Sequence, residues 1–453
     1  MSKPVVAFVG RPNVGKSTLF NKLVGKRISI VDDTPGVTRD FIYGECEWRN
    51  RKISLIDTGG IETAKTNDLI VNKIRAQAEF AIDLANVIVF VVDVKSGMVS
   101  SDIEIAHMLK KSGKPVVLCV NKSDSIGNND YDFLEFYNLG LGEPIKVSSI
   151  HGRGTGDLLD AIFENLSFGE TKEEKDSISV AVIGKPNVGK SSLVNYISGY
   201  QRSMVSDIAG TTRDNIDTKI SNTYGNYNFI DTAGIRRRSK VTEKIEKYSI
   251  IRAKLAIDRA DVCIIMVDAK EGVTEQDKKV AGLSHEAGKA SIIMVNKWDA
   301  IEKDDKTMEK YKKKIRQELL FISYAPIVFA SVKTGQRVNT IFENINMVSE
   351  NTLMRISTGT LNDFLARAVV KTPLPTHKGK RLKIYYMTQV SVKPPTFIFF
   401  VNKAELFHFS YQHYIENNLR QTFGFIGTPI RFIIREKSQN NDNSPSFEDL
   451  PKR

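Results

Sequence analysis

The chain has 453 residues, of which 41% are hydrophobic and 26% are charged, and its formal net charge is +12. This length exceeds what one hydrophobic core usually supports, so we expect about three domains. No apolar run approaches the ~20 residues that cross a bilayer, and the N-terminal MSKPVVAFVG enters a strand pattern at once. We therefore predict a cytoplasmic protein without a signal peptide. Cys46, Cys119 and Cys263 lie far apart in apolar or strand-like stretches, which argues against a disulfide or zinc framework.

The first glycine-rich stretch, GRPNVGKSTLFN at 10–21, returns as GKPNVGKSSLVN at 184–195. Other landmarks recur at the same offset, since 184 − 10, 212 − 38, 231 − 57 and 234 − 60 all equal 174. The paired residues are Gly10 with Gly184, Thr38 with Thr212, Asp57 with Asp231, and Gly60 with Gly234. A repeat of this kind indicates duplication of a whole domain.

Each copy alternates short apolar runs with amphipathic stretches. The apolar runs predict buried strands at 5–10, 52–57, 87–93, 115–121 and 144–149, and at 178–184, 227–231, 262–268, 290–296 and 326–331. Helical patterns, such as those at 68–84 and 242–258, lie between them. The order predicts an α/β fold in which a mainly parallel sheet is covered by helices on both faces.

The pattern changes near residue 350. We place the first domain at 1–166, a polar linker at 167–177 and the second domain at 178–350. A helix at 352–370, strands at 381–390 and 396–402, a helix at 411–423 and a strand at 429–436 predict a small αββαβ domain over 351–437. The polar tail, 438–453, is expected to be disordered.

The αββαβ segment is strongly basic. It contains 13 Lys and Arg residues and 4 Asp and Glu residues, a net charge of 13 − 4 = +9. Such a segment attracts polyanions such as RNA by counterion release. A solvated basic surface explains the charge equally well.

The pattern G-x-x-x-x-G-K-S predicts a phosphate-binding loop, because its glycines let successive N–H groups face a phosphate at a helix N-terminus. Lys16 and Lys190 are expected to reach the terminal phosphates, and Ser17 and Ser191 to bind Mg²⁺. The alternative is a degenerate loop that binds phosphate without hydrolysis. The expected loop contacts are Gly10, Arg11, Pro12, Asn13, Val14, Gly15, Lys16, Ser17 and Thr18, and Gly184, Lys185, Pro186, Asn187, Val188, Gly189, Lys190, Ser191 and Ser192.

NKSD at 121–124 and NKWD at 296–299 each follow an apolar strand and predict the base-reading element. An aspartate carboxylate accepts both N1–H and N2–H of guanine, whereas adenine offers no such pair of donors. Asp124 and Asp299 are therefore the predicted guanine readers. Asn121 and Asn296 are expected to brace the neighbouring loops, and the stems of Lys122 and Lys297 to cover the ring. Four further residues are expected to support guanine from its O6 side, namely Ser148, Ser149, Ser331 and Val332.

DTGG at 57–60 and DTAG at 231–234 each follow a strand, where a carboxylate can meet the magnesium shell and a glycine N–H the γ-phosphate. Thr38 and Thr212 sit at the spacing of a switch threonine that completes that shell. The residues predicted here are Asp57, Thr58, Gly59, Gly60, Asp231, Thr232, Ala233 and Gly234. The predicted metal ligands are Ser17, Thr38 and Asp57, and Ser191, Thr212 and Asp231.

Together these paired motifs and the basic αββαβ segment resemble the Der (EngA) family of tandem GTPases, over nearly the whole chain up to about residue 437. The resemblance implies two P-loop GTPase domains followed by a KH-like domain packed against them. It also implies GTP hydrolysis and nucleotide-dependent association with rRNA and precursors of the large ribosomal subunit. We expect a monomer that does not bind membranes. Two alternatives are a GTPase of a tRNA-modification complex and a GTP-gated scaffold with negligible turnover.

The catalytic step departs from Ras-like enzymes, in which a glutamine after the DxxG motif orients the attacking water. Ile61 and Ile235 occupy those positions here, and isoleucine cannot polarise water. The resemblance implies K⁺ as activator, because Asn13 and Asn187 match the asparagine that helps to hold this ion in related GTPases. The alternative role for each asparagine is a side-chain hydrogen bond to the loop backbone.

Three further segments have an ordinary interpretation beside a functional one. The run IRRRSK at 235–240 is as consistent with a solvated surface as with contact to rRNA. GFIG at 424–427 resembles the RNA-clamping loop of KH domains, but its position between a helix and a strand favours a turn. The aromatic residues of 396–402 and 406–414 are expected to lie mostly in the core.

Overall fold

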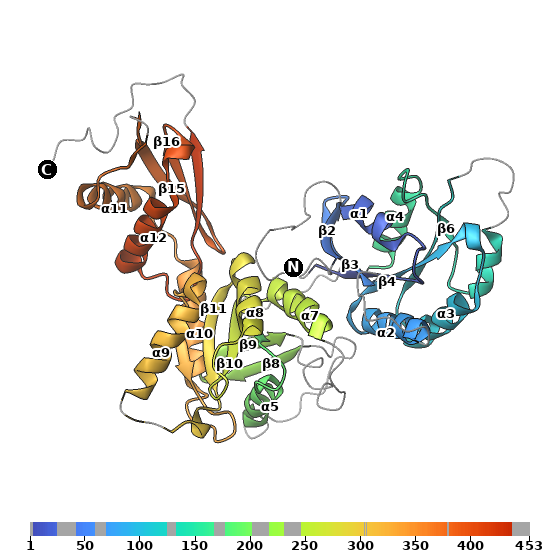
Figure 1. Cartoon of the computed structure of the whole chain (residues 1–453), viewed down its shortest axis with the longest axis horizontal. Coiled ribbons are helices and arrows are strands. Elements are labelled where there is room, and N and C mark those ends of the chain that lie inside the picture. The colour runs from blue at the N-terminus through green and yellow to red at the C-terminus, as the bar shows by residue number, and fades with distance from the viewer. Residues whose placement is uncertain are drawn as a thin grey trace. The chain divides into compact units, whose positions relative to one another are not determined.

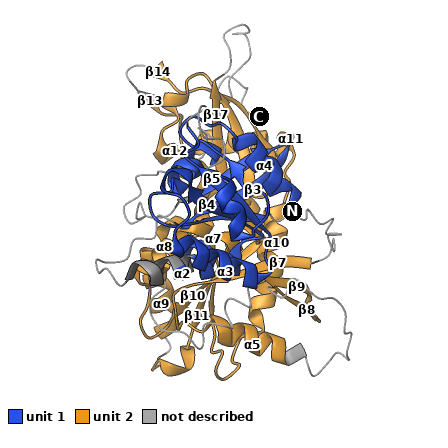
Figure 2. Cartoon of the chain, turned by 90° about the vertical axis from the view of Figure 1, so that its right-hand side faces the viewer, with its two compact units in different colours: residues 1–173, 245–251 blue, residues 174–244, 252–453 orange. Residues whose placement is uncertain are grey.

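The computed structural model describes residues 3–24, 42–58, 69–124, 133–166, 177–201, 217–230, 246–302, 304, 306–377 and 380–436. The chain divides into two compact units, Met1–Glu173 with Ile245–Ile251 and Glu174–Lys244 with Arg252–Arg453, which are coloured separately in Figure 2. Within the described ranges, no helix has both the length and the apolar character needed to span a bilayer.

The first unit is built on a six-stranded sheet with the order β2-β3-β1-β4-β5-β6. Its strands are β1 Val5–Val9, β2 Ile42–Trp48, β3 Arg51–Asp57, β4 Val87–Asp93, β5 Val116–Asn121 and β6 Ile145–Lys146. Every pairing is parallel except that of β2 with β3. All seven residues of β4 are buried, as expected for a strand covered on both faces.

Helices cover both faces of this sheet (Figure 1). They are α1 Lys16–Val24, α2 Leu69–Leu84, α3 Ser100–Ser112 and α4 Thr155–Glu164. Alternate residues of β1 point to opposite faces, so Phe8 packs in one core with α1 and α4, while Ala7 packs in the other with α2 and α3. Because β1, β3, β4, β5 and β6 run parallel, their carboxyl ends meet at one edge of the sheet.

The second unit contains a sheet of the same topology, β12-β11-β10-β7-β9-β8. Its strands are β7 Ser177–Ile183, β8 Thr218–Asn222, β9 Gly225–Ile230, β10 Val262–Asp268, β11 Ala290–Asn296 and β12 Ile327–Phe329. The helices are α5 Lys190–Gln201, α7 Glu246–Arg259 from Arg252 onward, α8 Glu275–Glu286, α9 Thr307–Glu318 and α10 Thr340–Leu353. Read from β8 to β12, the second order matches the first, which confirms the domain duplication. β7 takes the central place of β1, and β8 takes the antiparallel edge place of β2.

The predicted parallel sheets are confirmed, but the antiparallel edge strands β2 and β8 were not predicted. The reason is visible in β8, where Ile220 is buried and the other residues, such as Lys219, are exposed or half-buried. An edge strand of this kind contains no continuous apolar run. In addition, β7 begins at Ser177, which the sequence analysis assigned to the linker, and the boundary predicted at 350 falls inside α10.

The last part of the chain forms a three-stranded sheet with two helices packed on one face (Figure 1). Its elements are α11 Thr358–Lys371, β15 Ile384–Val392, β16 Pro395–Val401, α12 Phe409–Phe423 and β17 Arg431–Glu436. β16 pairs antiparallel with β15 and parallel with β17. This order confirms the predicted αββαβ arrangement. A small hairpin, β13 Thr376–His377 and β14 Lys380–Arg381, precedes β15.

The helix predicted at 352–370 is wrong at its start. α10 continues to Leu353, and α11 begins only at Thr358. Ser357 caps α11, because its side-chain oxygen accepts a hydrogen bond from the N–H of Thr360 at 3.2 Å. The strand predicted at 381–390 is likewise divided between β14 and β15.

The αββαβ domain packs on the second sheet through the segment 424–427, whose last two residues form the predicted turn. The N–H of Gly427 donates to the carbonyl of Tyr324 at 2.8 Å, and its own carbonyl accepts from the N–H of Ser291, in β11, at 2.7 Å. Lys393 also forms an ion pair with Asp261 at 2.9 Å. Gly427 thus extends the hydrogen bonding of the second sheet beyond β12.

Gly427 has a φ of 81°, and a Cβ at this position would lie 2.1 Å from Cγ1 of Val348. We predict that Gly427→Ala lowers the free energy of unfolding of the second unit by about 2–4 kcal/mol, from backbone strain and overpacking together. Urea unfolding followed by the fluorescence of Trp298, in a Trp48→Phe background, measures the change. Hydrogen exchange at the Ser291 amide should accelerate.

Gly424→Ala is the matched control. Gly424 also has a positive φ, 92°, but a Cβ there meets nothing within 4 Å. Its substitution should destabilise the unit by about 1–2 kcal/mol and leave the Ser291 amide protected. Equal effects of the two substitutions would show that the contact with Val348 does not matter.

Candidate functional site

The loop between β1 and α1 is closely packed against neighbouring backbone. Gly10 has a φ of 155°, and a Cβ on it would lie 2.3 Å from the carbonyl oxygen of Val91. Gly15 has a φ of 92°, and its Cβ would lie 2.2 Å from Nδ2 of Asn121. Both positions require glycine, so the loop backbone passes directly beside β4 and the end of β5.

The loop between β7 and α5 repeats this geometry. A Cβ on Gly184 would lie 2.6 Å from the carbonyl oxygen of Met266, and one on Gly189 would lie 2.2 Å from Nδ2 of Asn296. The two glycines have φ values of 149° and 107°. The sequence repeat is therefore also a repeat of backbone conformation.

Asn13 and Asn187 adopt left-handed backbone conformations, with φ values of 65° and 61°. Asparagine tolerates this conformation better than most residues, which gives it a local role in each loop. Among the described residues, none forms a hydrogen bond with either side chain. The loop-shaping side-chain hydrogen bond considered for these asparagines is therefore absent from the described part of the chain.

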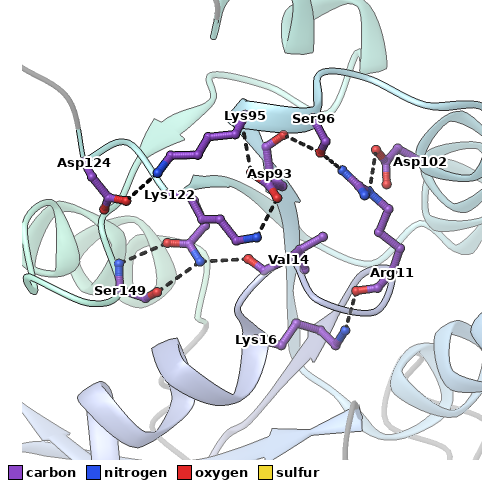
Figure 3. A network of polar contacts seen from close by, with 11 residues as sticks. Arg11, Val14, Lys16, Asp93, Lys95, Ser96, Asp102, Lys122, Asp124 and Ser149 are labelled. Atoms are coloured by element: carbon purple, nitrogen blue, oxygen red, sulfur yellow. Dashed lines mark hydrogen bonds and ion pairs between the residues drawn. The ribbon is translucent and has the colours of Figure 1, made fainter. Parts of the chain in front are cut away.

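The loop lysines lie along their own loops. Nζ of Lys16 donates to the carbonyl of Gly10 at 2.8 Å. It also donates to the carbonyl of Arg11 at 2.7 Å (Figure 3). Nζ of Lys190 donates to the carbonyls of Gly184 and Lys185 at 2.7 and 2.6 Å. Burial lowers the pKa of Lys16 to about 8, although the nearby Asp57 charge partly opposes the shift.

Ser17 and Asp57 meet beside the first loop. The hydroxyl of Ser17, at the start of α1, donates to Oδ2 of Asp57, at the end of β3, at 2.5 Å. A hydroxyl and a carboxylate are ligands that Mg²⁺ prefers, so this pair fits the predicted magnesium site. Next to it, the buried Thr58 hydroxyl donates to the carbonyl of Phe8 at 2.6 Å and fixes the end of β3 against β1.

A buried asparagine connects the loops at the end of each fifth strand. Nδ2 of Asn121 donates to the carbonyl of Val14 at 2.8 Å, and its Oδ1 accepts from the N–H of Ser149 at 3.0 Å. In the second copy, Asn296 makes the same two contacts, with Val188 at 2.8 Å and Val332 at 3.0 Å. The predicted bracing role of both asparagines agrees with these contacts.

Asp124 lies at the predicted base-reading position of the first copy. It accepts a hydrogen bond from the Ser148 hydroxyl at 2.6 Å. It accepts another from Nζ of Lys95 at 3.0 Å (Figure 3). The hydrogen bond from Ser148, followed by that from Lys95, holds the pKa of Asp124 below its usual range. The carboxylate is therefore ionised at neutral pH, as an acceptor of two N–H groups must be.

Several site residues were not predicted. Asp93 and Asp268 end β4 and β10, and each pairs with the lysine of the base-reading motif: Lys122 at 2.7 Å and Lys297 at 2.5 Å. Both strands end in aspartate, in VIVFVVD and VCIIMVD, so comparison of the two copies could have identified these residues. Lys95 is a partner that only the tertiary structure reveals.

The second residue of each loop reaches a fully buried carboxylate. Arg11 lies 3.5 Å from Asp102 of α3 and also donates to Ser96. Lys185 lies 2.6 Å from Glu271 and 3.7 Å from Asp277 of α8. Burial raises the pKa of Asp102, and the Arg11 charge opposes that shift.

The structure groups the predicted residues of the first copy at one edge of the sheet and repeats most of this group in the second. Ser331 is buried there, and its hydroxyl oxygen accepts from the N–H of Thr334 at 3.2 Å. Some predicted residues lie outside the described residues, namely Thr38, Gly59, Gly60, Thr212, Asp231, Thr232, Ala233 and Gly234. The basic run 236–240 also lies outside them.

Comparison with known proteins agrees with this duplicated site. Residues 5–122 and 179–297 match the family described as 50S ribosome-binding GTPase, and residues 355–435 match the KH-domain-like family of EngA bacterial GTPase enzymes, C-terminal. GTPase Der of Acetivibrio thermocellus is 61% identical over 440 residues, with 97% of this chain and 100% of the relative covered. For GTPase Der of Ruminiclostridium cellulolyticum the identity is 60% over 444 residues, with the same coverage.

The chain belongs to the Der (EngA) family of tandem GTPases. It is a GTP-binding enzyme that hydrolyses GTP, with two P-loop domains and a KH-like C-terminal domain. Among solved structures, the G-domain of FeoB from Methanococcus jannaschii is 26% identical and covers 36% of this chain and 98% of that chain, with a TM-score of 0.28.

Lys16 makes stability depend on pH. Its pKa is about 8 in the folded chain against 10.5 for an ordinary lysine, so the unfolded chain binds more protons between these values and stability rises with pH there. Relative to Lys16→Met, the wild type should gain about 1–2 kcal/mol of unfolding free energy from about pH 7.5 to about pH 9.5. Urea unfolding followed by Trp48 fluorescence, in a Trp298→Phe background, measures this gain.

Lys22→Met provides the control, because Lys22 is exposed on the same helix. It should leave the pH dependence of the wild type unchanged. A wild type and a Lys16→Met variant whose stabilities change in parallel with pH would contradict the burial argument.

Proposed function

We propose that the two GTPase domains bind GTP with Mg²⁺ and that their nucleotide states control association with rRNA and precursors of the large ribosomal subunit. The observation that supports this most is the repeated geometry around Asn121 and Asn296, because the same hydrogen bond holds the glycine-rich loop in both domains. The match to a family described as 50S ribosome-binding supports the partner. We expect the protein to act in the cytoplasm.

The phosphate end of each site is assigned to the loop backbone and its lysine. Lys16 and Lys190 each donate to two loop carbonyls, which holds both ammonium groups beside the loop backbone where a phosphate would bind. A bound Mg²⁺ would supply positive charge that neutralises the phosphates. Ser17 and Asp57 are proposed to hold it together with Thr38, and Ser191, Thr212 and Asp231 to do so in the second domain.

The base end is assigned to the aspartates. Asp124 is held by Ser148 and Lys95 at the mouth of the first site, and its ionised carboxylate suits the two N–H groups of guanine. Asp299 is proposed to do the same in the second domain. The stem of Lys122 is fixed by the ion pair with Asp93, which positions it to cover the ring.

The function is tested by sedimentation with purified large ribosomal subunits in GTP, GDP, a non-hydrolysable GTP analogue and ATP. We expect association to differ among the guanine nucleotides and not to respond to ATP. Lys16→Ala and Lys190→Ala should each weaken this response, because each removes a phosphate contact. Lys22→Ala, an exposed position on α1, is the matched control.

Association that ignores both the nucleotide and the two substitutions would refute nucleotide control. Pelleting with liposomes but not with subunits would favour the scaffold alternative.

K⁺ is proposed as the activator of hydrolysis. The side chains of Asn13 and Asn187 are exposed at loop positions that the described residues leave without a hydrogen bond, so each amide oxygen is available to a cation. A bound K⁺ supplies positive charge where negative charge develops in the transition state. The proposal gives hydrolysis a charge source that Ile61 and Ile235 cannot provide.

Turnover in K⁺ should exceed turnover in Na⁺ by about tenfold or more if the cation acts as a charge donor. Asn13→Gly and Asn187→Gly are informative substitutions, because glycine keeps the left-handed conformation and removes only the amide. The double variant should lose the preference for K⁺ while still binding GTP. Equal rates of the wild type in the two salts would remove the role given to these asparagines.

A further inference from the structure

The three-stranded sheet of the KH-like domain has two different faces. Its inner face, which includes Met387, Phe397 and Phe399, is buried against α11 and α12. The opposite face presents Tyr386 and Ile433 with exposed fractions of 39% and 40%. Alternation along each strand places these two side chains on the outer face, together with Phe400, Ile398 and Arg435.

Two aromatic rings stack on this outer face. Tyr386 of β15 and Phe400 of β16 are direct cross-strand partners, with ring centroids 4.3 Å apart and an angle of 16° between the rings. Arg435 of β17 is the partner of Phe400 on its other side. Aromatic, aromatic and guanidinium groups therefore follow one another across the sheet, a row that presents flat, stackable surfaces beside a positive charge.

Basic residues lie at this end of the sheet. Arg381 and Lys383 lie beside Asn402, because Asn402 hydrogen-bonds to the carbonyl of Arg381 at 3.0 Å and to the N–H of Lys383 at 2.9 Å. The cations at this end are Arg381, Lys383, Lys403 and Arg435, and the anions are Glu405 and Glu436, which gives 4 − 2 = +2. Lys403 lies 3.6 Å from Glu436. This excess of positive charge favours a polyanion such as RNA over an uncharged protein surface.

The segment 424–427, which resembles an RNA-clamping loop, has another role here. Gly427 uses both its N–H and its carbonyl to contact the second GTPase domain, and Phe425 is fully buried. The opposite end of the sheet is occupied in the same way, since Arg431 donates to the carbonyl of Glu286 at 2.7 Å. The end with Tyr386, Phe400 and Arg435 is the accessible one.

We propose that this outer sheet face binds single-stranded RNA, with an unpaired base stacked on the Tyr386–Phe400 pair and a phosphate beside Arg435. The proposal rests on the proposed function and names the RNA-binding surface within it. Every base has a π-face, so an aromatic platform flanked by cations binds single strands with little sequence preference. Exposed aromatics on an open sheet are an established way to hold unpaired bases.

The test uses the full-length chain and a fluorescently labelled oligouridylate of about ten nucleotides, with binding followed by anisotropy. Tyr386→Leu should weaken binding by about fivefold or more, because it removes the ring, whereas Tyr386→Phe should retain it. Phe409→Leu is the matched control, since Phe409 is an aromatic residue on α12 with an exposed fraction of 67%. It should leave binding unchanged.

Two further measurements separate binding from a purely structural role of the aromatic pair. Arg435→Gln should reduce the slope of log Kd against log salt by about 0.7, the value for one lost phosphate contact on a single strand. Ultraviolet crosslinking of the wild type should attach the oligonucleotide to Tyr386 or Phe400. A side chain that only stabilises the sheet would change neither measurement.

Wild-type affinity in Tyr386→Leu, or crosslinks confined to other segments, would overturn the proposal. The proposal would also fail if Tyr386→Leu kept oligonucleotide binding but lost association with ribosomal subunits, because the face would then contact protein. If the wild type sediments with subunits but does not bind the oligonucleotide, this inference fails alone. If it sediments with no subunit in any nucleotide, the proposed function fails as well.

Discussion

The fifth strand of each GTPase domain ends in a buried asparagine, Asn121 in one copy and Asn296 in the other. Each donates from its nitrogen to the phosphate loop and accepts with its oxygen from the loop after the last strand. An aspartate could not donate, and a leucine would leave both backbone groups unsatisfied. The closeness of this amide also explains why Gly15 and Gly189 are required. The glycine-rich loop and the loop after the last strand are therefore parts of one hydrogen-bonded assembly.

The two copies differ in how their loops are anchored to helix α3 in the first domain and helix α8 in the second. Arg11 meets the buried Asp102 with a planar guanidinium, while Lys185 meets Glu271 and the buried Asp277 with a point charge. Arginine and lysine differ in hydrogen-bond geometry and hydration, so the two ion pairs are not chemically equivalent although the loops they hold have the same backbone conformation.

Much of this architecture follows from the sequence because central strands are buried on both sides. The runs at 87–93 and 262–268 coincide with β4 and β10, whose residues are all buried. The edge strand β8 shows only one buried residue and gives no such signal. The break before α11 has a local signal, because Ser357 caps the helix three residues before Thr360, but apolar periodicity alone does not show it. Lys95 becomes a partner of Asp124 only when two loops meet. Such contacts depend on tertiary structure, which periodicity does not encode.

The position of Gly427 has a consequence for the solubility of the second GTPase domain. β12 is a three-residue strand at the border of its sheet, and the neighbouring N–H of Ser291 and carbonyl of Tyr324 are both satisfied by Gly427. Unpaired groups along a sheet border are a template on which other chains add strands. By pairing with both groups, the C-terminal domain removes these two from such a template, a protective task independent of any RNA.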